Sequence, residues 1–217
     1  MTTNEMPAMV AETMTGGKRT AAGVQYNSSI HPQPINSQVV GKNPRQVRTL
    51  ALPLYVPAEL ESAPWVPWRY DVDKNTGKPT KIPINVHTGG NAKIDTPSTW
   101  SDFETALAYY HEHPDRVSGL FVVMHGTDLA GADFDHCIDD GVIQPQALAH
   151  VRALNSYTEY SPSNAGLRVF GLGVKPGKRS KSGDIELYDG SSKRFLSFTG
   201  RHLPLSLIHI SEPTRPY

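Results

Sequence analysis

Two aspartates, Asp133 and Asp135, follow an apolar stretch of the chain. Side chains two residues apart on a strand share a face, so a strand ending here would present both carboxylates side by side. Such a pair can bind hard divalent cations, and two Mg²⁺ or Mn²⁺ ions are what in-line phosphoryl or nucleotidyl transfer uses. An isolated Asp-x-Asp pattern is more often a surface turn, so the pair alone leaves both interpretations open.

A third acid, Glu186, lies in a segment where polar and apolar residues alternate. Ile185 and Leu187 would face a core, and Glu186 would then project from the opposite face of the strand. It could complete a site of three carboxylates with Asp133 and Asp135. An ordinary polar strand face explains the same pattern equally well.

The segment between these acids, residues 161–168, has the sequence SPSNAGLR. A turn containing Ser161 and Ser163 offers hydroxyls and backbone N–H groups to phosphate oxygens, and Arg168 adds a forked cation. The alternative is a surface hairpin turn with a solvated arginine.

Spacing argues against two other chemistries. No Gly-Lys dipeptide of the chain is followed by the Ser or Thr that a Walker motif requires, so this is not a P-loop protein. His136 and Cys137 are adjacent, and no second pair at zinc-site spacing lies nearby. Cys137 is the single cysteine, which excludes an internal disulfide.

The charge is balanced overall but not along the chain. With 21 basic and 21 acidic residues there is no global basic field. Residues 95–140 hold ten acids against one arginine (a balance of −9), whereas residues 168–201 hold eight basic residues against three acids (+5). A region that gathers cations beside one that gathers phosphates suits a nucleotide-handling site. Two solvated faces of opposite bias remain the alternative.

Seven strands are expected after residue 64. The proline-bounded aromatic segment 65–70 favours a strand, with Trp65 and Trp68 in the core. Hydrophobic runs and alternation predict further strands at residues 119–124, 129–135, 156–160, 166–172, 184–188 and 194–198.

Two helices are expected between these strands. Ser101 and Glu104 have capping-box spacing, and Pro114 lies just past the end of this first helix. Pro145 can open a second helix that runs through Leu154. Strands and helices alternate without strict βαβ regularity, so we expect an α+β fold with a mostly antiparallel or mixed sheet.

The 217 residues, 38% of them apolar, fit one globular domain. Residues 1–50 show no sustained period and are expected to be a disordered leader, with the domain at 51–204. Residues 205–217 contain LSLIHISEPTR, which looks like a translated sequencing adapter, so the natural frame is expected to be cut near residue 204. The longest apolar run is far short of the ~18 residues of a membrane span, and we expect a cytoplasmic protein.

The order of motifs resembles a known family, the N-terminal primase-polymerase domain of phage and plasmid replication proteins in the archaeo-eukaryotic primase superfamily. Each motif alone is weak, but together, in this order, they are specific. They are WVPWRY (65–70), KPTKIP (78–83), TPSTW (96–100), GADFD (131–135), YTEYSPSNAGLR (157–168), IELY (185–188), RF (194–195) and TG (199–200).

The resemblance implies an RRM-like catalytic sheet packed with a smaller α/β module. It implies that Asp133, Asp135 and Glu186 are the catalytic acids and bind Mg²⁺ or Mn²⁺ in a two-metal site. The residues that it places on the nucleotide are Ser161, Ser163, Arg168, Lys81 and Arg194. The second motif commonly has Gly where this chain has Asn164, and His where it has Arg168; arginine keeps the positive charge and the affinity for phosphate.

Two functions compete on this basis. The first is a template-dependent nucleotidyltransferase, a DNA primase and polymerase that uses dNTPs or NTPs on single-stranded DNA, with a helicase module in the full-length protein. The second is a non-catalytic single-stranded nucleic-acid-binding module of the same fold, which the altered second motif would allow. A metal-dependent nuclease is a more distant third.

Overall fold

The computed structural model describes residues 48–51, 54–178 and 180–204, which fold into two antiparallel sheets. The five-stranded sheet contains, in spatial order, β7 (Tyr157–Tyr160), β8 (Leu167–Leu172), β4 (Leu129–Phe134), β10 (Ile185–Tyr188) and β9 (Lys181–Ser182). The four-stranded sheet contains β11 (Phe195–Phe198), β3 (Gly119–Val123), β1 (Trp65–Val72) and β2 (Pro79–Pro83). A small hairpin of β5 (Ile138–Asp139) and β6 (Val142–Ile143) follows β4.

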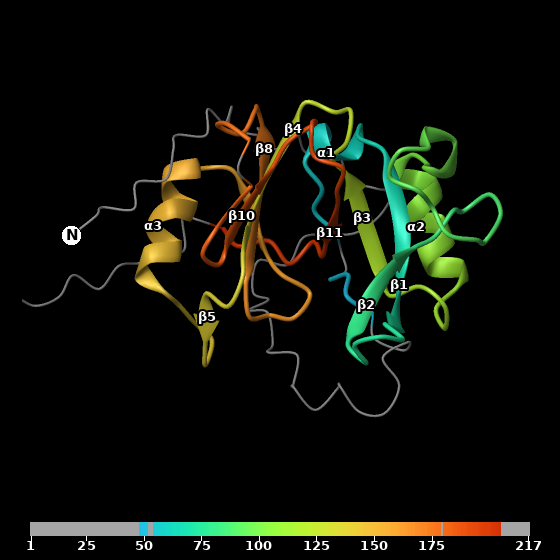
Figure 1. The fold of residues 1–217 in the computed structure, drawn as a ribbon, viewed down its shortest axis with the longest axis horizontal. Helices are drawn as coiled ribbons and strands as arrows, with labels where there is room; N and C mark the ends of the chain where they lie inside the picture. Colours follow the sequence, from blue (N-terminus) through green and yellow to red (C-terminus); the bar gives the residue numbers. More distant parts are fainter. Residues whose placement is uncertain (1–47, 52–53, 179, 205–217) are drawn as a thin grey trace, which may run out of the picture.

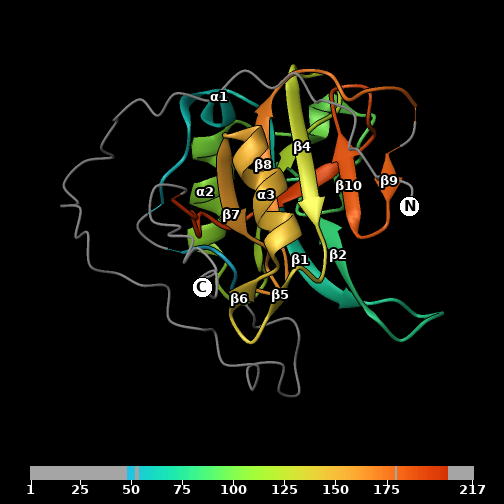
Figure 2. The ribbon, with the colours of Figure 1, turned by 90° about the vertical axis from the view of Figure 1, so that its left-hand side faces the viewer.

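Within the described residues, three α-helices accompany the sheets. They are α1 (Ala58–Glu61), α2 (Phe103–Glu112) and α3 (Pro145–Leu154), and a short 3₁₀ helix, η3 (Pro97–Thr99), precedes α2. In Figure 1 the two sheets lie side by side between α3 on the left and α2 on the right. Figure 2 shows α3 lying across the five-stranded sheet. The expected α+β fold with antiparallel strands is therefore confirmed.

Aromatic side chains join α2 to both sheets. The ring of Trp65 in β1 lies 5.0 Å from Phe103 of α2 and 5.2 Å from Phe198 of β11. Phe198 in turn contacts the rings of Phe170 in β8 and Tyr157 in β7, at 6.2 and 5.9 Å. Because one continuous core includes residues of both sheets, the sheets are fixed relative to each other.

The packing of α3 determines which side chains of the five-stranded sheet face the other sheet. Val151 and Leu154 of α3 belong to the same buried cluster as Ala132 and Phe134 of β4. Side chains alternate along a strand, so Asp133 points away from α3, toward the four-stranded sheet. The core on one face thereby orients an acid on the other.

The expected strands and helices are found with small shifts at their ends. Helix α2 is capped by Asp102 and not by Ser101: the Asp102 side chain accepts a 2.7 Å hydrogen bond from the backbone N–H of Thr105. Strand β4 ends at Phe134, one residue before Asp135. Trp65 and Trp68 are fully buried, as expected. Strand β2 was not among the expected strands.

The packed domain begins earlier than residue 51. Thr49 is buried, and both its backbone N–H and its hydroxyl donate to the carbonyl of Ser118, at 2.8 and 3.0 Å. The Arg48 guanidinium lies 3.6 Å from the centre of the Tyr110 ring. Residues 48–50, expected in the leader, are thus part of the domain, while the rest of the expected leader and the expected adapter segment lie outside the described residues.

Among the residues that the structure describes, no helix has the length and apolar character needed to cross a bilayer.

Candidate active site

A row of charged side chains crosses the face of the five-stranded sheet that is turned away from α3. Glu159, Arg168, Asp133, Glu186 and Lys181 come from β7, β8, β4, β10 and β9, and each lies directly opposite its neighbour in the strand register. Directly opposed residues of antiparallel strands present their side chains on the same face. We call these five residues the charged row; its order is acid, base, acid, acid, base.

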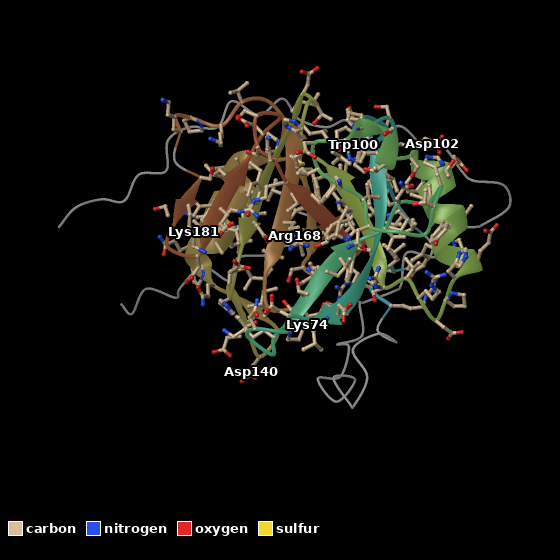
Figure 3. All side chains as sticks on the ribbon, turned by 45° about the vertical axis from the view of Figure 1, so that its right-hand side comes forward. Lys74, Trp100, Asp102, Asp140, Arg168 and Lys181 are labelled. Carbon is tan, nitrogen blue, oxygen red and sulfur yellow. The ribbon has the colours of Figure 1, made fainter. Side chains whose placement is uncertain are left out.

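Arg168 lies at the contact between the two sheets (Figure 3). Its Nη1 donates to the carbonyl oxygen of Ser197 in β11 at 2.9 Å and to the Ser197 hydroxyl at 2.5 Å, while its Nη2 donates to Asp133 Oδ2 at 3.1 Å. Only 6% of the residue is exposed. The alternative of a solvated arginine in a turn is therefore wrong, and Arg168 is a buried strand residue that joins the two sheets.

Asp133 and Asp135 lie close to each other but differ in their backbone setting. Asp133 is in β4, whereas the Asp135 backbone N–H, just past the strand end, donates to the carbonyl of Asp184 at 2.8 Å. Burial and the nearby charges of Asp133 and Glu186 raise the pKa of Asp135, although Arg168 acts in the opposite direction. The three predicted acids are thus near enough to repel one another.

Glu186 is paired with basic and phenolic groups. Its Oε1 accepts a 2.7 Å bond from Lys181 Nζ, and its Oε2 accepts one from the hydroxyl of Tyr188. The hydrogen bonds from Lys181 and Tyr188 lower the pKa of Glu186, and the same ion pair raises the pKa of Lys181. The Arg194 guanidinium lies 5.9 Å from the Tyr188 ring, which places it beside Glu186.

Lys81 reaches the charged row from the four-stranded sheet. Its Nζ donates to the Ser197 hydroxyl at 3.3 Å and lies 5.2 Å from the Trp68 ring. Burial and the neighbouring charge of Arg168 lower the pKa of Lys81 to about 8, against the attraction of Asp133 and Asp135. The structure therefore brings together Lys81, Arg168 and the predicted acids.

The turn between β7 and β8 holds the two predicted serines in a fixed arrangement. The Ser161 hydroxyl accepts a 3.1 Å bond from the backbone N–H of Gly166 and lies 3.0 Å from the Ser163 hydroxyl. Asn164 has a φ of 61°, in the left-handed region where glycine is favoured and asparagine is next best. This explains how Asn can stand where the family commonly has Gly.

Three charged residues of the site were not among the predicted site residues: Lys181, Arg201 and Glu159. Arg201 donates to the Ser161 carbonyl at 2.7 Å and to the Asn164 side chain, so it anchors the turn. Glu159 is fully buried and accepts hydrogen bonds from the backbone N–H groups of Thr199 and Gly200. Burial raises the pKa of Glu159 to about 7, against Arg168 and these hydrogen bonds. The alternation of residues would place Glu159 on one face of β7, but no feature of the sequence shows that this face is buried.

The acids have the right donor chemistry for a hard divalent cation. Asp133 Oδ1 is buried without a hydrogen-bond partner, and a cation would relieve the repulsion that raises the pKa of Asp135. Within the described residues, no three His, Cys, Asp or Glu side chains are already arranged as a metal site. Asp133 and Glu186 are paired instead with Arg168 and Lys181. The oxygen donors of these acids fit such an ion by their chemistry, and in this structure two of the three carboxylates are held by basic side chains.

Comparison with known proteins bears on the identity of this site. No protein-family model matches the chain. The chain is 32% identical over 147 residues to a protein named DNA Primase-polymerase from Nitratiruptor phage NrS-1, an alignment that covers 64% of this chain and 19% of the phage protein. The chain thus spans about a fifth of the length of the relative that it matches. This match confirms the resemblance that the motifs indicated, because the chain is similar to a phage protein named as a primase-polymerase.

Proposed function

We propose that this chain contains the template-dependent nucleotidyltransferase domain of a DNA primase-polymerase. The observation that carries the proposal is the charged row, in which two of the predicted acids, Asp133 and Glu186, lie on the same sheet face as Arg168. The third acid, Asp135, lies just past the end of β4, and Lys81 reaches this region from the other sheet. Nucleotidyl transfer uses carboxylates that bind metal cations and basic side chains that bind phosphates, and this region offers both kinds of group. The relationship to the phage enzyme supports the same activity.

In this proposal the 3′ hydroxyl of a primer attacks the α-phosphate of a bound nucleotide. A phosphodiester bond forms, the bond between the α- and β-phosphates breaks, and pyrophosphate leaves. Asp133, Asp135 and Glu186 would hold Mg²⁺ or Mn²⁺, which activates the attacking oxygen and neutralises the leaving group. Arg168 and Lys81 bind the phosphates, and the Ser161 and Ser163 turn and Arg194 border the same region.

Arg168 has two roles in this scheme. Without a nucleotide it neutralises Asp133, and with one its guanidinium transfers from the carboxylate to a phosphate oxygen. Its Nη1 bonds to Ser197 need not break, so the exchange requires only that the Nη2 side of the guanidinium change its partner.

The fold provides for these roles in two modules. The five-stranded sheet would be the RRM-like catalytic sheet, and the four-stranded sheet with α2 the smaller α/β module. The partners in this proposal are a single-stranded DNA template and dNTPs or NTPs. We also propose that the domain belongs to a longer phage or plasmid replication protein that contains a helicase module.

Primer extension tests the proposal. The chain should extend a labelled primer with the nucleotide complementary to the template, and only with Mg²⁺ or Mn²⁺ present. Arg168→Ala and Lys81→Ala should each raise the nucleotide KM by about ten- to hundredfold, because each removes a charge-assisted hydrogen bond. Arg168→His, which supplies the more common family residue, should recover part of the loss.

The matched controls are two exposed basic residues, Arg116→Ala and Lys78→Ala, which should leave KM unchanged. If the wild-type chain binds single-stranded DNA but incorporates no nucleotide, the non-catalytic binding module is the correct interpretation.

A further inference from the structure

Ser197 contacts both of the basic side chains that the proposed function assigns to the phosphates, Arg168 and Lys81. It lies in β11, it is 3% exposed, and its hydroxyl accepts hydrogen bonds from Arg168 at 2.5 Å and from Lys81 at 3.3 Å. Its carbonyl oxygen accepts a second bond from Arg168 at 2.9 Å. A serine hydroxyl has two lone pairs, so one neutral oxygen can accept from two cations of different origin.

The two cations would separate without a shared acceptor. Arg168 belongs to the five-stranded sheet and Lys81 to the edge strand of the other sheet, and their positive charges repel. The bonds to Ser197 offset this repulsion and fix the direction in which each cation points.

The backbone after Ser197 is itself held in place. The Glu159 carboxylate accepts hydrogen bonds from the N–H of Thr199 at 2.9 and 3.1 Å, and from the N–H of Gly200 at 2.9 Å. Gly200 has a φ of 67°, a conformation that L side chains rarely adopt. The end of β11 is thus anchored two residues beyond Ser197, which makes Ser197 a rigid support.

We propose that Ser197 is a positioning residue for nucleotide binding, which holds Arg168 and Lys81 at the spacing that engages neighbouring phosphates of one triphosphate. The inference rests on the proposed function, since it assigns these cations to the nucleotide. In this proposal Ser197 touches neither the reacting atoms nor a bound metal ion. It acts through the two basic side chains that it holds, Arg168 and Lys81.

The test compares Ser197→Ala and Ser197→Thr, with Ser156→Ala as the matched control. Ser156 is also a buried serine beside a strand, and its hydroxyl donates to the Phe170 carbonyl at 2.6 Å and not to a charged group. Ser197→Ala should raise the nucleotide KM by about tenfold with little change in kcat, because bonds to charged groups are among the stronger ones. Ser197→Thr keeps the hydroxyl and should restore most of this loss.

A second measurement separates this inference from the proposed activity. Calorimetric titration with inorganic triphosphate in EDTA measures phosphate binding by Arg168 and Lys81 when no nucleotide can be incorporated. Ser197→Ala should bind triphosphate about tenfold more weakly than the wild type and Ser156→Ala. If the wild type incorporates no nucleotide yet shows this difference, the proposed function fails and the positioning role stands.

Equal triphosphate affinity in Ser197→Ala and the wild type, or no binding by the wild type, would overturn the inference. A KM effect that Ser156→Ala reproduces would do the same, because it would show only general loss of a buried hydroxyl.

Discussion

Arg168 and Asp133 face each other across β8 and β4, with Arg168 Nη2 3.1 Å from Asp133 Oδ2 and with 7% and 14% of their side chains exposed. A predicted metal ligand is therefore neutralised by a predicted phosphate ligand. The two charges of this pair compensate each other in the structure. In the proposed function, a bound cation would take Asp133 and a bound triphosphate would take Arg168 as new partners.

The first prediction concerns the energy of this ion pair. Arg168→Ala and Asp133→Ala should each lower the free energy of unfolding by about 3 kcal/mol in EDTA, because each leaves a mostly buried charge without its partner. The double variant should lose clearly less than the sum of the two. Urea unfolding of the four proteins gives the coupling energy, and strictly additive losses would show that the pair makes no energetic contribution.

The second prediction concerns pH and Glu159. Its pKa is raised from 4.5 to about 7 in the folded chain, so between these values the folded state keeps a proton that the unfolded state has lost. The protonated Glu159 therefore contributes on the order of 3 kcal/mol to the free energy of unfolding. This contribution is full below pH 4.5, falls as the pH rises to about 7 and is then lost. Glu159→Gln removes this dependence.

Urea unfolding at several pH values between 5 and 8 measures the pH dependence that Glu159 gives to the stability. The groups that face Glu159 are Tyr157, Arg168 and Arg201, and all are retained in the variant. The stability of the wild type relative to Glu159→Gln should decline as the pH rises toward 7. A difference that is the same at every pH, or that equals the result for the exposed acid in Glu112→Gln, would contradict the assignment.

The third prediction concerns the close approach of Gly166, the residue before β8, to the end of β4. A Cβ added at Gly166 would lie 2.4 Å from the carbonyl oxygen of Phe134, the residue between Asp133 and Asp135. Gly166→Ala should therefore destabilise the fold by about 3 kcal/mol and reduce nucleotide incorporation, since the backbone must shift.

Gly90→Ala is its control, because there the nearest atom to an added Cβ is the Thr88 hydroxyl oxygen at 3.4 Å. It should change stability by no more than about 0.5 kcal/mol. Equal unfolding midpoints for the two alanine variants would show that the contact at Gly166 is not tight.

Hydrophobic patterning was sufficient for most of the fold. Alternation around Ile185 and Leu187 located β10 and also the face of Glu186, because a period of two fixes the strand and its orientation together. Strand β2 was missed because Pro79 and Pro83 stand at its two ends and Lys81 interrupts any apolar pattern. Proline is tolerated there because β2 is at the edge of its sheet.

The candidate site was predictable only where a single strand determines it. The three acids could be selected because each lies in or beside a recognisable strand. The burial of Arg168 and its contact with Ser197 depend on how two sheets pack, and nothing in the local sequence records that packing. Asp102 displaced Ser101 as the helix cap for a similar reason, since both residue types can cap and the structure begins the helix at the buried Phe103.

The most direct test of the central claim is single-turnover incorporation by Asp135→Asn, measured together with its affinity for single-stranded DNA. Asp135 is chosen because the buried ion pair of Asp133 stays intact in this variant, and Asp139→Asn supplies an exposed acid as the control. Incorporation should fall at least about a hundredfold, since even outer-shell partners of metal ligands contribute up to that factor. Single-strand affinity should be nearly unchanged, because it depends on basic residues. Undiminished incorporation by folded Asp135→Asn would contradict the assignment of this sheet face as the catalytic site.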